Sequence, residues 1–186
     1  WLKETGAPKT KTEKGYSVYE ATSMRPTLDL NGIGGGYQGQ GAKTVLPAKA
    51  MAKISCRLVP NQDPTDIAEK LVRHFEKNAP DTVRVTAREL HGGSPYLADT
   101  SNPAMQAAKD AMADVYGTQA HFTREGGSIP ITADFKRILG LDTVLMGFGL
   151  ASDALHSPNE NFELDRFHKG IAASIGFMQR FGEKVA

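Results

Sequence analysis

The stretch DALHSPNENFELD, residues 153–165, contains a side chain that could carry out chemistry. His156 stands among turn-forming residues, between the apolar run TVLMGFG and a segment with helical periodicity. Neutral imidazole is the commonest metal ligand among protein side chains. Open α/β sheets bind ligands at their carboxyl edge, where this loop is expected to lie. His156 is therefore a candidate metal ligand, and the alternative is a solvated loop histidine.

A second stretch, TREGGSIPIT, predicts an anion-binding turn. It places two glycines, the second of them Gly127, before Ser128 at an expected helix start. The first N–H groups of a helix are unpaired and favour an anion, and glycine lets a ligand come close to the backbone. The alternative is an N-capping serine after a flexible turn.

Two further polar residues end segments that alternate like strands. Arg57 lies on the polar face of one such segment, and His91 ends another, directly before Gly-Gly. Both are candidate site residues, and the alternative for each is a residue exposed for solubility. We expect His74, His121 and His168 to be structural or surface residues, because no polar cluster surrounds them.

The elements that must position these residues change character along the chain. Apolar and polar residues alternate with period two in residues 28–33, 45–58 and 83–91. Residues 63–79 have a helical period instead, and the pair Asp63–Pro64 is a capping signal for that helix. The order strand, strand, helix, strand predicts an α+β unit in which one helix covers an antiparallel sheet. The face of the long strand expected to be buried carries Ala50, Ala52, Ile54, Cys56 and Leu58.

The stretch GGSPYLADTSNP predicts a boundary, because the pattern changes after it. Helices are expected at 103–116 and 128–139, and short strands at 120–123 and 142–149. A final amphipathic helix is expected at 164–181. This alternation predicts an α/β segment. The apolar stripe of the last helix consists of Phe167, Ile171, Ile175 and Met178.

Composition excludes several classes of protein. The 186 residues are 40% hydrophobic and 23% charged, with a formal net charge of +1, and no basic stripe alternates with aromatic residues. Nucleic acid is therefore not an expected partner. No apolar run could span a membrane, and the lone Cys56 excludes an internal disulfide framework, so we expect a cytoplasmic protein. The chain lacks an initial Met and a signal-peptide core, which suggests the middle of a longer protein.

Four blocks in sequence order resemble one known family. They are RPTLDLNGIGGGYQGQGAKTVLPAKAMAKISCRLVPNQDP, HGGSPYL, TREGGSIPI and HSPNENF. Together they resemble the two-zinc metallopeptidase family of carnosine dipeptidases, cytosolic non-specific dipeptidases, carboxypeptidase G and succinyl-diaminopimelate desuccinylase, above all its dipeptidase branch. The resemblance covers the chain from about Arg25 to its end.

The resemblance implies a hydrolase with a ferredoxin-like lid that dimerises and an α/β catalytic domain that carries two zinc ions. In the family's terms, residues 25–92 would be part of the lid and 93–186 the end of the catalytic domain. Residues 1–24 are predicted to be a loop or linker from their own composition, because they contain Gly, Pro, Lys and Thr without a period. His156 matches the last zinc ligand. Arg57, Ser128 and the glycine amides at Gly127 match the pocket for the substrate's terminal carboxylate. His91 matches a substrate-contacting histidine at the edge of the lid, and Thr44 a lid residue that reaches the partner subunit's active site.

The chain departs from the family's pattern in one major respect. The other zinc ligands of the family are a His-x-Asp, a bridging Asp, a Glu-Glu pair that includes the general base, and a further Asp, and none of these motifs occurs here. The lid's first strand and helix are also missing. We therefore expect a C-terminal portion of a homodimeric enzyme that hydrolyses dipeptides or N-acyl amino acids. This chain alone is expected neither to hold zinc stoichiometrically nor to catalyse. The alternative is a non-catalytic dimerisation module, or one that binds peptides or carboxylates.

Overall fold

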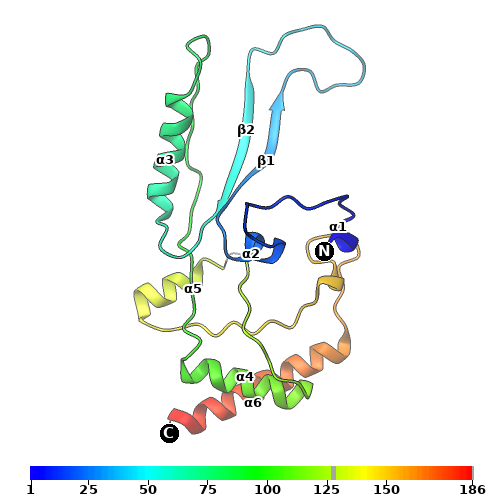
Figure 1. Cartoon of the computed structure of the whole chain (residues 1–186), viewed down its shortest axis with the longest axis vertical. Helices are drawn as coiled ribbons and strands as arrows, with labels where there is room; N and C mark the ends of the chain where they lie inside the picture. Colours follow the sequence, from blue (N-terminus) through cyan, green and yellow to red (C-terminus); the bar gives the residue numbers. More distant parts are fainter. Residues whose placement is uncertain (127–128, 186) are drawn as a thin grey trace. The chain divides into compact units, whose positions relative to one another are not determined.

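The computed structural model describes residues 1–126 and 129–185 and divides them into two compact units (Figure 1). Unit 1 comprises Trp1–Tyr96 and Arg124–Ala133, and unit 2 comprises Leu97–Thr123 and Asp134–Ala186. The described residues between Arg124 and Ala133 therefore belong to the first unit, although they lie far from it in sequence. The assignment of a linker, a partial lid and the end of a catalytic domain stays a prediction.

Unit 1 begins with two short helices, α1 (Leu2–Thr5) and α2 (Val18–Ser23), where a linker without regular structure was expected. A capping box forms α2: the Ser17 hydroxyl accepts the Glu20 N–H, and the Glu20 carboxylate accepts the Ser17 N–H. Two backbone donors of the first turn are thereby paired. The Ser-x-x-Glu spacing of this motif was visible in the sequence and was missed.

Strands β1 (Thr27–Gly35) and β2 (Ala50–Arg57) form an antiparallel pair, with Leu30 opposite Ile54 and an irregular register between Leu30 and Gly32. The alternation predicted for β2 is present at its end, where half-buried Ile54 and Cys56 flank exposed Ser55. At its beginning, residues 50–53 are exposed on both faces. In this part of the described chain the sheet does not supply a covered core.

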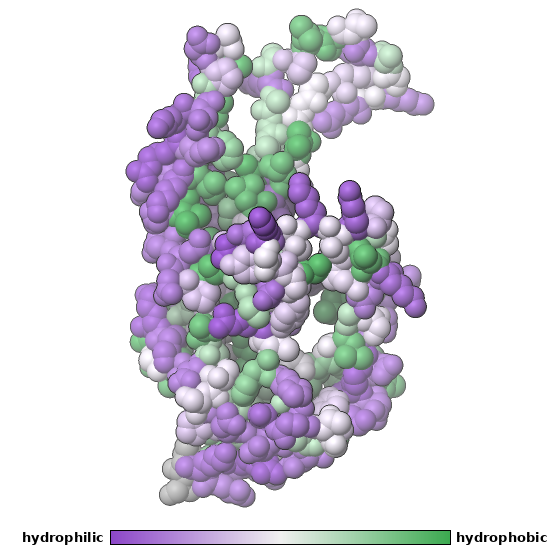
Figure 2. All heavy atoms as spheres, in the orientation of Figure 1, coloured by the Kyte–Doolittle hydropathy of each residue, from purple (hydrophilic) through white to green (hydrophobic). Residues whose placement is uncertain are grey.

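Helix α3 (Pro64–Lys77) forms as the sequence predicts. The Asp63 carboxylate accepts the Asp66 N–H at 2.9 Å, and Pro64 occupies the first turn. The apolar side is half-buried, and Figure 2 shows apolar side chains gathered between α3 and the β1–β2 pair, with polar residues on the outer side of the helix. Its half-buried residues are Ile67, Ala68, Leu71, Val72 and Phe75.

Unit 2 is built on the crossing of α4 (Pro103–Tyr116) and α6 (Leu164–Val185), which lie against each other in Figure 1. Asn102 caps the start of α4, and left-handed Gly117 ends it. The contact is made by small residues, since an added Cβ on Gly176 would lie 3.5 Å from the Ala111 methyl group. Asp114 on α4 and Arg180 on α6 form an ion pair beside this contact. The fully or nearly buried apolar residues are Met105, Ala107, Ala108, Ala111 and Ala173.

The apolar stripe predicted for α6 is not the face that meets α4. Its four residues are about half exposed, from 47% for Ile171 to 62% for Met178. Ala173, on another face, is fully buried. The period of the apolar residues identified a helix correctly, but the close approach of two backbones selects small residues for the contact. The helix also extends to Val185 instead of ending near 181.

Three predicted strands do not form. Residues 83–91, 120–123 and 142–149, all within the described chain, have no strand structure. A strand is stabilised through hydrogen bonds to a neighbour, and the described residues offer these segments no paired neighbour. The fold is therefore α+β, and the strands expected in the α/β segment of the second half are absent from the described residues.

The second half also contains an irregular helix where a regular one was predicted from residue 128. Helix α5 (Ile131–Asp134) begins three residues later and continues as the π-helical turn η1 (Phe135–Leu139). Pro130 explains the late start, because proline disfavours the helical conformation of the residue before it. None of the described helices is long and apolar enough to cross a membrane.

Candidate functional site

His156 lies on a tightly turned loop of unit 2. The loop follows the short 3-10 helix η2 (Ala151–Asp153). Backbone hydrogen bonds close it on itself: Ser157 N–H donates to Ala154 O at 3.0 Å, and Asn161 N–H donates to Asp153 O at 3.0 Å. His156 itself has φ of +60°, in the left-handed region that residues with a side chain rarely occupy. The imidazole is exposed.

A buried ion pair lies under this loop. Asp153 is 1% exposed, and its two carboxylate oxygens accept Nη1 and Nη2 of Arg166 at 2.7 and 2.5 Å. Arg166 comes from the first turns of α6. A carboxylate oxygen of Asp153 also accepts the Leu150 N–H at 2.8 Å. The hydrogen bonds from Arg166, followed by the one from Leu150, lower the pKa of Asp153 to about 2.

Arg166 has further contacts that fix its guanidinium. It lies 5.0 Å from the centre of the Phe162 ring, donates to Phe148 O at 3.4 Å and pairs with Glu163 at 3.3 Å. The pKa of Arg166 is raised, mainly by its hydrogen bonds to Asp153. Sequence reasoning placed Asp153 beside His156 without a role. A buried Asp in a loop can signal such a pair, but the sequence does not single out Arg166 as the partner.

The described residues do not gather a metal site. Among them, no three His, Cys, Asp or Glu side chains come together closely enough to hold an ion. Catalytic zinc takes about three protein ligands and leaves one position open. Asp153 is already paired with Arg166, so His156 offers a single nitrogen. These residues alone do not fit a complete zinc centre.

The predicted substrate residues belong to unit 1 as far as they are described. Thr44 lies in the exposed connection between β1 and β2, Arg57 is the exposed last residue of β2, and His91 lies in an exposed irregular segment. Gly127 and Ser128 lie outside the described residues. Helix α5 begins at Ile131, three residues after the helix start predicted at Ser128.

The chain on both sides of Gly127 and Ser128 is held from within unit 1. The Tyr19 hydroxyl lies 3.2 Å from both the N–H and the carbonyl oxygen of Arg124. A Cβ added to Gly126 would overlap the Thr22 carbonyl oxygen of α2. Helix α2 therefore supports the start of this segment, and glycine is required at 126.

The segment that carries His91 runs beside the same stretch. An added Cβ on Gly93 would lie 2.9 Å from the Pro130 side chain. Gly93 of the block HGGSPYL and Pro130 of the block TREGGSIPI are thus neighbours in unit 1, although 25 residues separate the two blocks in the chain. This proximity could not be read from either block alone.

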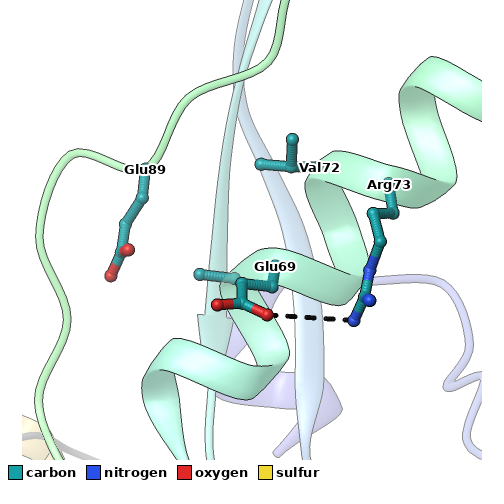
Figure 3. Close-up of a pocket in the computed structure, with 5 residues that line it drawn as sticks. Glu69, Val72, Arg73 and Glu89 are labelled. Carbon is teal, nitrogen blue, oxygen red and sulfur yellow. Dashed lines mark ion pairs between the residues drawn. The ribbon is translucent and has the colours of Figure 1, made fainter.

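An open hollow of about 330 Å³ lies on α3 (Figure 3). Its lining combines Val72 and Ala68 with the ion pair of Glu69 and Arg73, whose atoms are 3.9 Å apart, and Glu89 faces it from the neighbouring segment. It contains none of the predicted site residues and has no buried polar group that could orient a ligand. We do not assign a function to it.

Comparison with known proteins supports the four-block resemblance. Residues 6–180 match the model of peptidase family M20/M25/M40. The Cys-Gly metallodipeptidase DUG1 of Candida albicans is 37% identical over 163 residues, which cover 85% of this chain and 33% of the relative. The beta-Ala-His dipeptidase of Homo sapiens is 32% identical over 156 residues, covering 82% and 31%.

A solved structure extends the likeness to the fold. The di-peptidase Dug1p of Saccharomyces cerevisiae superposes with a TM-score of 0.85 and 32% identity, covering 98% of this chain and 39% of that one. This chain thus spans about a third of the length of the sequence relatives it matches. Well over half of each of these relatives has no counterpart in this chain.

Proposed function

The chain belongs to peptidase family M20/M25/M40, and from this membership we propose that it is part of a metal-dependent dipeptidase. The observation that carries the proposal is the match over residues 6–180, shared with relatives named as metallodipeptidases. Within that match, the substrates would be dipeptides or N-acyl amino acids, and the metal would be a pair of zinc ions. We also propose a cytoplasmic location, the expectation drawn above from the composition.

His156 would supply one zinc ligand, through an exposed imidazole at the tip of its loop. When bound, zinc polarises a scissile carbonyl and lowers the pKa of a bound water. The remaining ligands and the general base would come from chain outside these 186 residues. We therefore propose that this chain by itself neither retains zinc nor hydrolyses peptides.

Arg57, Ser128 and the amide at Gly127 would hold the terminal carboxylate of the substrate. A guanidinium presents a planar fork that matches a carboxylate with two parallel hydrogen bonds. With the helix start at Ile131, the fork and the Ser128 hydroxyl carry this proposal, and the helix dipole does not. His91 would contact the substrate at the edge of the lid, and Thr44 would reach a partner subunit's site.

The carboxylate assignment can be tested in a protein that contains this chain at the length of its relatives. Arg57→Lys keeps the charge and loses the fork. We expect kcat/KM on a dipeptide to fall by roughly 10- to 100-fold, from about 1.5–3 kcal/mol per charge-assisted bond. On the same dipeptide with an amidated C-terminus the loss should be much smaller. Arg84→Lys, on an exposed position of the same unit, is the matched control.

An equal loss on the acid and the amide would show that Arg57 does not bind the carboxylate. An unchanged kcat/KM on both would remove Arg57 from the site.

The metal proposal is tested by metal analysis of the 186-residue chain after dialysis. Stoichiometric zinc, or turnover that His156→Ala abolishes, would show a complete site within this chain.

We also propose that the chain forms a homodimer through unit 1. Apolar side chains of both strands are exposed, with Leu30 at 60%, Ile33 at 76% and Met51 at 56%. Exposed apolar patches and open strand edges favour association with another chain. A molecular mass by light scattering that stays monomeric at high concentration would contradict this proposal.

The second candidate function is a non-catalytic module that dimerises or binds carboxylates. The absence of a metal cluster among the described residues is the observation that favours it. It differs from the first in one measurable respect: a module would not gain peptidase activity when the missing motifs His-x-Asp and Glu-Glu are supplied in the same reading frame.

A further inference from the structure

The His156 loop adopts a backbone conformation that is unfavourable in isolation. Three of its residues other than glycine have positive φ: Ala154 at 54°, His156 at 60° and Asn159 at 64°. Left-handed conformations of such residues are costly and persist where the surrounding structure imposes them.

The contacts that close the loop meet at Asp153. Its backbone oxygen accepts the Asn161 N–H across the loop, and its carboxylate accepts the Leu150 N–H on the approaching chain. The same carboxylate accepts the two hydrogen bonds from Arg166, which lies in α6. Both ends of the loop are therefore tied to the helix through one buried ion pair.

We propose that Asp153 and Arg166 are positioning residues for His156, and that their buried ion pair holds loop 150–161 in the conformation that presents the imidazole. The importance of this presentation rests on the proposed function, in which His156 binds a metal. Groups outside the first coordination shell that orient a ligand commonly change metal affinity by about 10- to 100-fold. Asp153 and Arg166 touch neither substrate nor metal in this assignment and act through the loop.

A second ion pair on α6 provides a matched contrast. Asp165 and Lys169 are 2.7 Å apart, but their side chains are 74% and 41% exposed. They join residues within one helix and do not hold the loop. Exposed pairs of this kind contribute little to stability. If any ion pair with a cation of the first turns of α6 were sufficient, replacing Asp165 would have the same effect on the loop as replacing Asp153.

The test is solution NMR on the 186-residue chain without metal, which separates it from the metal proposal. A residue with φ near +60° gives a strong nuclear Overhauser effect between its own amide and α protons, so this signal reports the conformation of His156. Asp153→Asn keeps the shape of the side chain and loses the charge. We expect the His156 signal to weaken and the Asn161 amide to exchange at least about tenfold faster. Asp165→Asn should change both within about twofold.

Arg166→Lys is the second variant, because it keeps the charge and loses the fork that makes two bonds. It should give the same pattern to a smaller extent, while the amide of Ala173 in α6 keeps its exchange rate and shows that the helix is intact. An unchanged His156 signal and Asn161 exchange rate in either folded variant would overturn the proposal. So would equal effects of Asp153→Asn and Asp165→Asn.

Zinc added to the wild-type chain, followed on the His156 ring signals, reports separately whether the imidazole takes the metal. Lack of a response would agree with the proposal that this chain alone does not retain zinc, and stoichiometric binding would contradict that proposal. Either outcome leaves the positioning result unaffected.

Discussion

The α4–α6 pair of unit 2 and the β1–β2 pair of unit 1 differ in how far they bury their apolar side chains. Four alanines at the helix crossing are at most 5% exposed. In the strand pair, by contrast, apolar Leu28, Leu30 and Ile33 are more than half exposed. Both pairs are antiparallel or crossing neighbours with many mutual contacts, so contact alone does not produce a core.

The difference follows from how each element pairs its backbone. A helix satisfies its own N–H and C=O groups, so two helices need only complementary side chains to bury a surface. A strand leaves half of its backbone groups to a second neighbour, and two strands alone are marginal in water. The helix pair is thus expected to be the stable element of this chain, and the strand pair to depend on what covers it.

Overpacking the helix crossing should produce the largest effect. Ala173 is fully buried, and Leu at this position has no space between α6 and α4. Ala173→Leu should destabilise the pair by about 1–3 kcal/mol. Hydrogen exchange measured by mass spectrometry on peptides from α4 and α6 should then accelerate. Ile33→Ala in β1 is the contrasting change. Because Ile33 is 76% exposed, this substitution should change the free energy of exchange by less than about 0.5 kcal/mol.

A large loss from Ile33→Ala would contradict the comparison, because it would show that the strand pair is stabilised by contacts of its own. Equal tolerance of both substitutions would show that the helix crossing is looser than its burial indicates.

The next effect concerns pH and the loop of unit 2. The pKa of Asp153 in the folded chain is about 2, below the value near 3.9 of an unfolded Asp. A depressed pKa contributes stability that is present above the unfolded value and is lost as pH falls through the folded one. The difference in exchange protection of Asn161 between the wild type and Asp153→Asn should therefore be constant above about pH 5. It should shrink between about pH 4 and 2.

A difference that shrank near pH 6 instead would assign the effect to another group. The β1–β2 pair contains no comparable buried ion pair among its described residues, so its exchange should not follow this profile.

The same distinction between helix and strand explains which elements could be predicted from the sequence. The bounds of α4 and the capping of α3 were predicted correctly, because Asn102–Pro103 and Asp63–Pro64 are local signals. The strand at 83–91 was predicted from alternation that is present in the sequence, but alternation does not supply a partner. Even for α6 the periodic stripe pointed to one apolar face, and the alanine face made the contact.

For the candidate site, residue type and spacing were informative and spatial relations were not. The position of His156 in a loop followed from its turn-forming neighbours in sequence. Its left-handed backbone and the Asp153–Arg166 pair did not, because the partner lies thirteen residues away on a helix. The neighbouring position of Gly93 and Pro130 likewise depends on folding of unit 1 as a whole.

The smallest effect is expected from removing the N-terminal caps of α3 and α4, which have equally short hydrogen bonds. Asp63 accepts the Asp66 N–H and Asn102 accepts the Ala104 N–H, each at 2.9 Å. Replacing either by Ala should cost about 1 kcal/mol. Helix α3 has no buried residue, whereas α4 has four, so the first turn of α3 should fray measurably while α4 stays protected.

The measurement is amide exchange at the first turn of each helix, compared with its centre. Asn102 also donates to Asp142 at 3.3 Å, so Asn102→Ser, which keeps a capping oxygen and loses that bond, is the matched control. If α3 were as resistant as α4, its half-buried side would be held more firmly than its exposure indicates. Fraying that spreads to the centre of α4 after loss of one cap would show that the α4–α6 contact does not stabilise the helix, and the contrast between the two units would no longer hold.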